Sequence, residues 1–139
     1  MLALLAVPML PSMAFVGTAG ELRVMRSANV RDVVVTMLGT TDGWTTGDNS
    51  FVLEFDSAPR KRLIAVDAPA LTAPAPAAGS ERLRASARLE RADVPGRYGG
   101  RITLPRAGDW NVTVAWGRAG SRESVTFPIP VQAALKGAR

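Results

Sequence analysis

The amino-acid sequence predicts an all-β protein, an antiparallel immunoglobulin-like β-sandwich of about seven strands. Two observations carry this prediction. Apolar and polar residues alternate with period two in several short segments, and turn-forming residues separate these segments at regular intervals. The chain has 139 residues, including 13 Gly and 10 Pro, which favours one domain of short elements joined by turns.

The first half of the chain supplies three predicted strands, at residues 30–38 (VRDVVVTML), 50–57 (SFVLEFDS) and 62–66 (RLIAV). The middle one alternates so that Phe51, Leu53 and Phe55 share one face. Residues 39–49 (GTTDGWTTGDN) have the composition of a loop. Residues 68–79 (APALTAPAPAAG) are rich in proline, so we expect an extended loop of polyproline II character rather than a regular central strand.

The second half supplies four more predicted strands, at residues 82–90, 98–104, 110–116 and 124–131. The first has good helix propensity, but its alternation favours a strand that turns its arginines to solvent. The third (WNVTVAW) is the clearest, because its tryptophans and valines all fall on one face. Pro128 and Pro130 mark the last as an edge strand. Turns are expected at residues 94–96, 105–109 and 117–120.

Residues 1–20 carry no charged side chain, and prolines follow the apolar run at residues 2–7. This pattern is typical of the apolar part of a secretory signal, although no basic residue precedes Arg23. We therefore expect a signal peptide or an N-terminal anchor at residues 1–19, with a buried apolar strand as the alternative. A linker at 20–29, a domain at 30–131 and a tail at 132–139 would follow. The expected location is periplasmic or secreted, or anchored to a membrane through the N-terminus.

The composition argues against most catalytic and metal chemistry. Cysteine and histidine are absent, which removes thiolates, disulfides, the commonest general base and the commonest transition-metal ligand. We expect no enzyme activity and no cofactor. Met25 and Met37 are the only methionines beyond the predicted leader, and two thioethers are more often packing residues than a copper site. The oxygen-rich loop at residues 42–49 fits turn chemistry better than a calcium site.

The basic residues are concentrated in the second half of the chain. Residues 1–59 contain three basic and six acidic side chains, whereas residues 60–139 contain fourteen basic and six acidic ones. The row Arg82, Arg84 and Arg88 is a candidate contact for an acidic protein or an anionic membrane, against the alternative of a solvated strand face. Nucleic acid is not expected, because no aromatic platform accompanies the arginines. Trp44 stands in a polar loop, as either a partner contact or a lid over the core.

Several segments together resemble the YtkA-like family, which is itself similar to the periplasmic part of FixH proteins. The matching residues are 46–51 (TGDNSF), 95–98 (PGRY), 107–114 (AGDWNVTV) and the last strand, and the resemblance covers about residues 30–131. It implies an exported or membrane-anchored β-sandwich, often associated with copper handling, efflux or cytochrome oxidase assembly. Family members often carry methionines in the middle loop. Residues 68–78 here keep the prolines without methionine, so the resemblance transfers no metal ligand to this chain.

The sequence thus predicts an exported, non-enzymatic accessory or protein-interaction domain beside a copper-transport, efflux or oxidase-assembly system. Its partner would be a membrane-associated or periplasmic protein. One alternative is a copper-binding domain that uses Met25 and Met37 or the loop of Asp42 and Asp48. Another is a sandwich that binds a small ligand or carbohydrate, with Trp44 stacked on a sugar.

Overall fold

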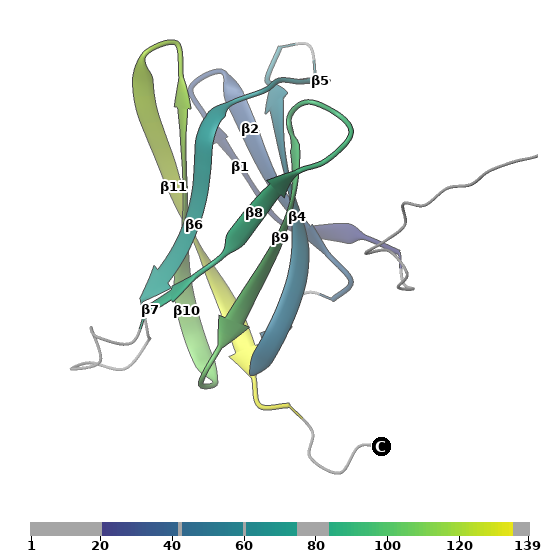
Figure 1. Cartoon of the computed structure of the whole chain (residues 1–139), viewed down its shortest axis with the longest axis vertical. Coiled ribbons are helices and arrows are strands. Elements are labelled where there is room, and N and C mark those ends of the chain that lie inside the picture. The colour runs from purple at the N-terminus through teal and green to yellow at the C-terminus, as the bar shows by residue number, and fades with distance from the viewer. Residues whose placement is uncertain (1–20, 42, 60, 75–83, 135–139) are drawn as a thin grey trace, which may run out of the picture.

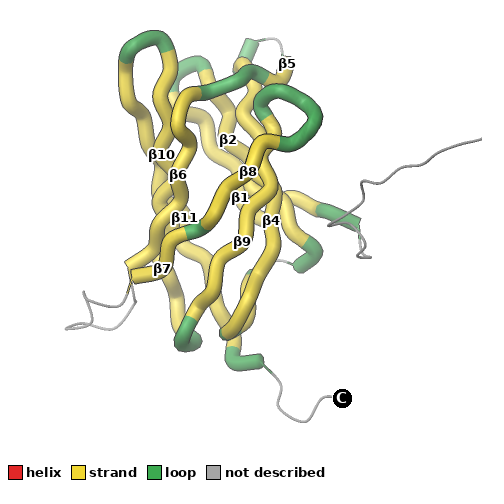
Figure 2. The backbone as a smooth tube through the Cα atoms, viewed as in Figure 1, coloured by secondary structure: helices red, strands yellow, loops and turns green. Residues whose placement is uncertain are grey.

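The computed structural model describes residues 21–41, 43–59, 61–74 and 84–134. These residues form two β-sheets packed face to face (Figure 1). Strands and loops account for all of the described backbone, without a helix (Figure 2). The β-sandwich is therefore confirmed, although the described residues form eleven strands rather than about seven. The immunoglobulin-like strand order stays a prediction, and the predicted leader at 1–19 lies outside the described residues.

Sheet A has the order β1-β2-β4-β9-β8, with β5 paired to β4, and all its pairs are antiparallel. Its strands are β1 (Arg23–Val30), β2 (Val33–Gly39), β4 (Gly47–Ser57), β5 (Arg62–Leu63), β8 (Arg88–Arg91) and β9 (Arg97–Leu104). Sheet B has the order β3-β11-β10-β6-β7, in which only the β11–β3 pair is parallel. Its strands are β3 (Trp44–Thr45), β6 (Asp67–Pro74), β7 (Arg84–Ser86), β10 (Gly108–Arg118) and β11 (Ser121–Gln132).

The core lies between the sheets and follows the predicted alternation. In β10, the side chains of Trp110, Val112, Val114 and Trp116 are fully buried. In β4, Phe51, Leu53 and Phe55 face them from the other sheet, and the rings of Phe55 and Trp116 lie 5.3 Å apart. Burial of large apolar side chains from both sheets is the main source of stability for such a fold.

Two segments predicted to lie outside the sheets are strands. Residues 20–29, the predicted linker, contain most of β1, whose period-two pattern is broken by a β-bulge between Val24 and Arg26. Residues 68–79, the predicted loop, overlap β6, which lies between β10 and β7 in sheet B. Its prolines do not interrupt the ladder, because Pro69 lies in an irregular stretch of the β6–β10 pairing and Pro74 ends the strand. The expectation that this segment could not be a central strand was therefore wrong.

The predicted strand at residues 82–90 is divided between the two sheets. Its first part is β7 in sheet B and its second part is β8 in sheet A. The chain crosses between them at Ala87, whose backbone N–H donates to the carbonyl of Leu71 (2.9 Å). This crossing closes one side of the sandwich and separates arginines that a single strand would have placed on one face.

The opposite side of the sandwich is closed by β1 and β11. β11 pairs with β10 along most of its length and with β3 only at Val131 and Gln132, so the predicted edge character holds for most of the strand. Arg26 of β1 spans the gap, and its Nε donates to the carbonyl of Pro128 (3.0 Å). The β10–β11 hairpin turns at Ala119 and Gly120, which both have positive φ (53° and 82°), as a tight two-residue turn requires.

Candidate interaction surface on sheet A

An apolar row crosses the outer face of sheet A. The strand register places Val24, Leu38, Val52 and Gly99 opposite one another on β1, β2, β4 and β9. Val52 is only 7% exposed although it does not belong to the core cluster, whereas Val24 is 56% exposed. At Gly99, no atom lies within 4 Å of the position that a Cβ would occupy. We call these four residues the apolar row. Val52 at its centre is buried, whereas Val24 at one end is exposed and Gly99 at the other end has no side chain.

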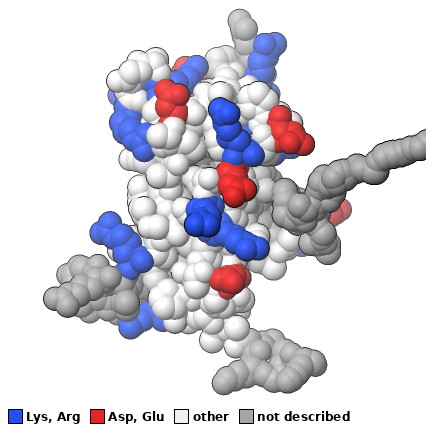
Figure 3. All heavy atoms as spheres, in the orientation of Figure 1, with Lys and Arg blue, Asp and Glu red and all other residues white. Residues whose placement is uncertain are grey.

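A pair of arginines lies beside the apolar row. Arg88 of β8 is directly opposite Arg101 of β9, and Ser50 of β4 continues the same line across the sheet. All three residues are exposed. Among the described residues, neither guanidinium has an ion-pair partner. Figure 3 shows basic side chains over β8 and β9 on the face that it presents.

The other side of the apolar row carries an internal ion pair. The Nε of Arg97 donates to Oε2 of Glu54 (2.8 Å), and these residues are cross-strand neighbours on β9 and β4. Asp56 lies two residues beyond Glu54 on the same face. Burial raises the pKa of the Asp56 carboxyl, and the charge of Glu54 raises this pKa further, while Arg97 opposes the shift. On this side of the row Glu54 and Arg97 neutralise each other and Asp56 has no ion-pair partner among the described residues, whereas the other side carries the two arginines.

Trp44, a predicted candidate contact, is not on the surface. Its side chain is only 4% exposed and packs on Phe51, with ring centroids 5.5 Å apart. The reason is the parallel pairing of β3 with the end of β11, which holds Trp44 opposite Val131 and turns its ring inward. The lid interpretation fits this position, and the ring presents no exposed face for a partner or a sugar to stack on.

The predicted arginine row is not one surface. Arg88 lies on the outer face of sheet A, while the pairing of Arg84 with Pro74 puts Arg84 on the outer face of sheet B. Arg82 lies outside the described residues. Arg88 lies opposite Arg101 instead. This neighbour can be inferred from the sequence only once β8 and β9 are known to pair.

The predicted metal candidates are placed as follows. Met25 and Met37 are both buried, at 6% and 0% exposure, and lie on the paired strands β1 and β2, with Met25 at the bulge. Asp48 is exposed and its Oδ1 accepts a hydrogen bond from Thr103 (2.6 Å), while Asp42 lies outside the described residues. Asn49 exchanges two hydrogen bonds with the backbone of Thr45, which is turn chemistry. In the described part of the chain, no three acidic side chains gather as metal ligands.

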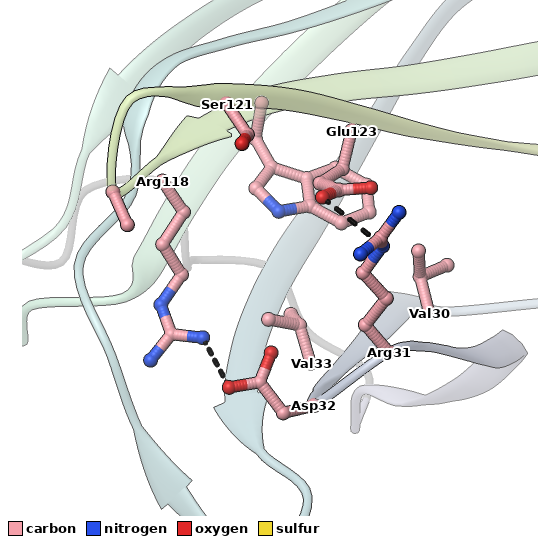
Figure 4. Close-up of a pocket in the computed structure, with 9 residues that line it drawn as sticks. Val30, Arg31, Asp32, Val33, Arg118, Ser121 and Glu123 are labelled. Carbon is pink, nitrogen blue, oxygen red and sulfur yellow. Dashed lines mark hydrogen bonds and ion pairs between the residues drawn. The ribbon is translucent and has the colours of Figure 1, made fainter.

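A hollow of about 290 Å³ lies at one end of the sandwich, between the β1–β2 and β10–β11 turns (Figure 4). Two ion pairs cross it from one sheet to the other: Arg118 to Asp32 (2.7 Å) and Arg31 to Glu123 (3.4 Å). The hydrogen bond from Arg118 lowers the pKa of the Asp32 carboxyl. Each of the four charged side chains has an ion-pair partner across the hollow. The two ion pairs therefore link the β1–β2 turn to the β10–β11 turn.

Comparison with known proteins identifies no relative of this chain. No family model, curated protein or solved structure matches this chain. Among the described residues there is no helix of the length and apolarity needed to cross a membrane.

Proposed function

We propose that this protein is an exported, non-enzymatic β-sandwich that acts as a protein-interaction or accessory domain and docks its partner on the outer face of sheet A. The apolar row is the observation that carries this proposal. The outer face of an antiparallel sheet is normally polar, yet here Leu38 near the end of β2 and Val52 at the centre of β4 occupy outward positions. An apolar strip bordered by charged residues has the anatomy of a protein interface.

The charges around the apolar row favour an acidic partner. The ion pair of Glu54 and Arg97 is self-contained, whereas Arg88 and Arg101 place two cations side by side without an ion-pair partner among the described residues. The carboxylates of Asp48, Asp56 and Glu90 lie elsewhere on this face. A partner with carboxylates beside an apolar patch would complement it. The uncharged N-terminus and the resemblance to YtkA-like proteins favour a periplasmic or membrane-associated partner, beside a copper-transport, efflux or oxidase-assembly system.

Site-specific photo-cross-linking in cells tests this proposal. A photoreactive amino acid at Leu38 should give one cross-linked product, whose partner is identified by mass spectrometry. The same group at Ser124, on the outer face of sheet B, is the matched control and should give none. Val24→Ser in the Leu38 background should abolish the product. Equal patterns at both positions, or no product at either, would show that the outer face of sheet A is not a docking face.

A copper-binding domain is the second candidate, because the structure brings the thioethers of Met25 and Met37 onto paired strands. A competition titration of the full chain with Cu(I) against a chelator of known affinity separates the two functions. Stoichiometric binding that is lost in both Met25→Leu and Met37→Leu would favour the copper domain. No binding above that of the chelator would leave the interaction domain.

A further inference from the structure

We infer that Arg88 and Arg101 together form a binding site for a single carboxylate side chain of a protein partner. This inference rests on the proposed function, since it names the chemistry by which the docking face recognises its partner. The two residues are directly opposite each other on neighbouring antiparallel strands, where side chains start only about 5 Å apart. Both point outward, because their neighbours Leu89 and Gly100 face the core.

The pair has no described contact that stabilises it in the free protein. Like charges directly opposite each other across two strands lower the stability of a sheet. Arg97 on the same sheet differs from this pair, because it forms an ion pair with Glu54 at 2.8 Å. Among the described residues, Arg88 and Arg101 have no such partner. An anion bound between the guanidiniums would turn a repulsive arrangement into an attractive one.

The surroundings of the pair favour a single carboxylate-bearing side chain over an extended anionic surface. The hydroxyl of Ser50 lies in the same line and offers one more donor. Carboxylates border the line on both sides, with Glu90 two residues after Arg88 and Asp48 two residues before Ser50. These charges would repel a polyanion or an anionic membrane, but they leave room for one carboxylate group. Gly99 carries no side chain next to this line, so a partner's backbone is able to approach closely.

The test is a titration of the full chain with a blocked peptide that carries a single glutamate between glycines, followed by NMR of the arginine Nε–H groups and by calorimetry. The signals of Arg88 and Arg101 should shift, and the double variant Arg88→Gln/Arg101→Gln should weaken binding at least about tenfold. Arg84→Gln removes another exposed arginine, on the outer face of sheet B, and should leave the affinity unchanged within about twofold. Equal losses in Arg84→Gln and in the double variant would overturn the inference.

Two further measurements complete the test. Vesicles of phosphatidylglycerol should bind weakly, and tight vesicle binding that depends on Arg88 and Arg101 would overturn the inference in favour of a membrane surface. The melting temperature of Arg101→Gln should stay equal to or exceed that of the parent, whereas a fall of several degrees would show a structural role. Failure of the proposed function is distinguishable from failure of this inference. Cross-linking at Leu38 can give no partner while the arginine pair still binds the single-glutamate peptide, and the reverse outcome is equally observable.

Discussion

At the scale of single residues, the tyrosine hydroxyl of Tyr98 is the clearest polar contribution to the core. It donates to the carbonyl of Val66 (3.1 Å) and accepts from the N–H of the same residue (3.3 Å), at a buried position. We expect Tyr98→Phe to lower the free energy of unfolding by about 1–3 kcal/mol, because both backbone groups lose their partner away from water. Urea denaturation measures this change.

The control for Tyr98 is an exposed hydroxyl pair. Thr113 and Thr126 are bonded through their hydroxyls at 2.9 Å on the outer face of sheet B, where water replaces a lost partner. Thr126→Val should therefore change stability by less than about 0.5 kcal/mol. Similar losses in the two variants would mean that the Tyr98 hydroxyl is not buried against Val66.

Asp56 and Asp32 give pH dependences of opposite sign. The pKa of Asp56 is raised above its ordinary value of 3.8, so the folded protein binds more protons than the unfolded chain in this range, and the group lowers stability as the pH rises. Asp56→Asn should thus stabilise the protein at pH 7 by less than about 1 kcal/mol, and the gain should vanish once the carboxyl is protonated in both states.

Asp32 is the matched comparison for Asp56. The hydrogen bond from Arg118 lowers the pKa of Asp32, so its contribution to stability is present above pH 3.8 and is lost as the pH falls through the folded value. Asp32→Asn should destabilise at pH 7, and this difference should shrink in acid. Thermal melts of both variants from pH 3 to 7 measure the two trends, and trends of the same sign would contradict the described surroundings of one carboxyl.

At the scale of strands, two adjacent glycines of β9 provide a direct test of which face is buried. A Cβ on Gly100 would clash with the ring of Phe51, whereas a Cβ on Gly99 would meet no atom within 4 Å. Gly100→Ala should destabilise the protein by about 1–3 kcal/mol through overpacking, and Gly99→Ala should be close to neutral. Denaturant unfolding of the pair measures this, and the reverse order would show that the register of β9 is shifted by one residue.

The same strands show what the sequence was able to predict. β10 was predicted almost completely, because its tryptophans and valines alternate without interruption. β1 was missed because the bulge at Met25 breaks the alternation, and β6 was missed because its prolines look incompatible with a ladder. Both errors have one cause. A bulge or a strand end removes the need for a regular hydrogen bond, and its position depends on the partner strand rather than on the local sequence.

The candidate surface was predictable only in part for a related reason. Arg88 is recognisable as an exposed strand residue from its alternation with Leu89. That it lies opposite Arg101, and that Leu38 and Val52 form one row, depends on strand order, which period-two patterns do not encode. For Trp44 the local sequence was misleading in another way. Its neighbours in sequence are polar, yet its ring is buried and packs on Phe51.

At the scale of the whole molecule, the open sides and one end of the sandwich are each closed by a specific contact. Arg26 bridges β1 to β11 on one side, the crossing at Ala87 links the sheets on the other, and the ion pairs of Arg31 and Arg118 span the end hollow. Since β11 also carries two prolines without N–H groups, its free edge is a poor template for another strand. This is consistent with the proposal that a partner docks on the outer face of sheet A rather than on the β11 edge.

Closure of the sandwich also determines how the tryptophans report on folding. Trp44, Trp110 and Trp116 are all buried, so the native emission should be blue-shifted and nearly insensitive to acrylamide. Unfolding should move it to the red and make it quenchable. Trp44→Phe decides the position of the lid directly: the remaining emission should keep the same low quenching constant as the parent. If the variant instead lost a strongly quenched component, Trp44 would be exposed, and its role as a partner contact would return.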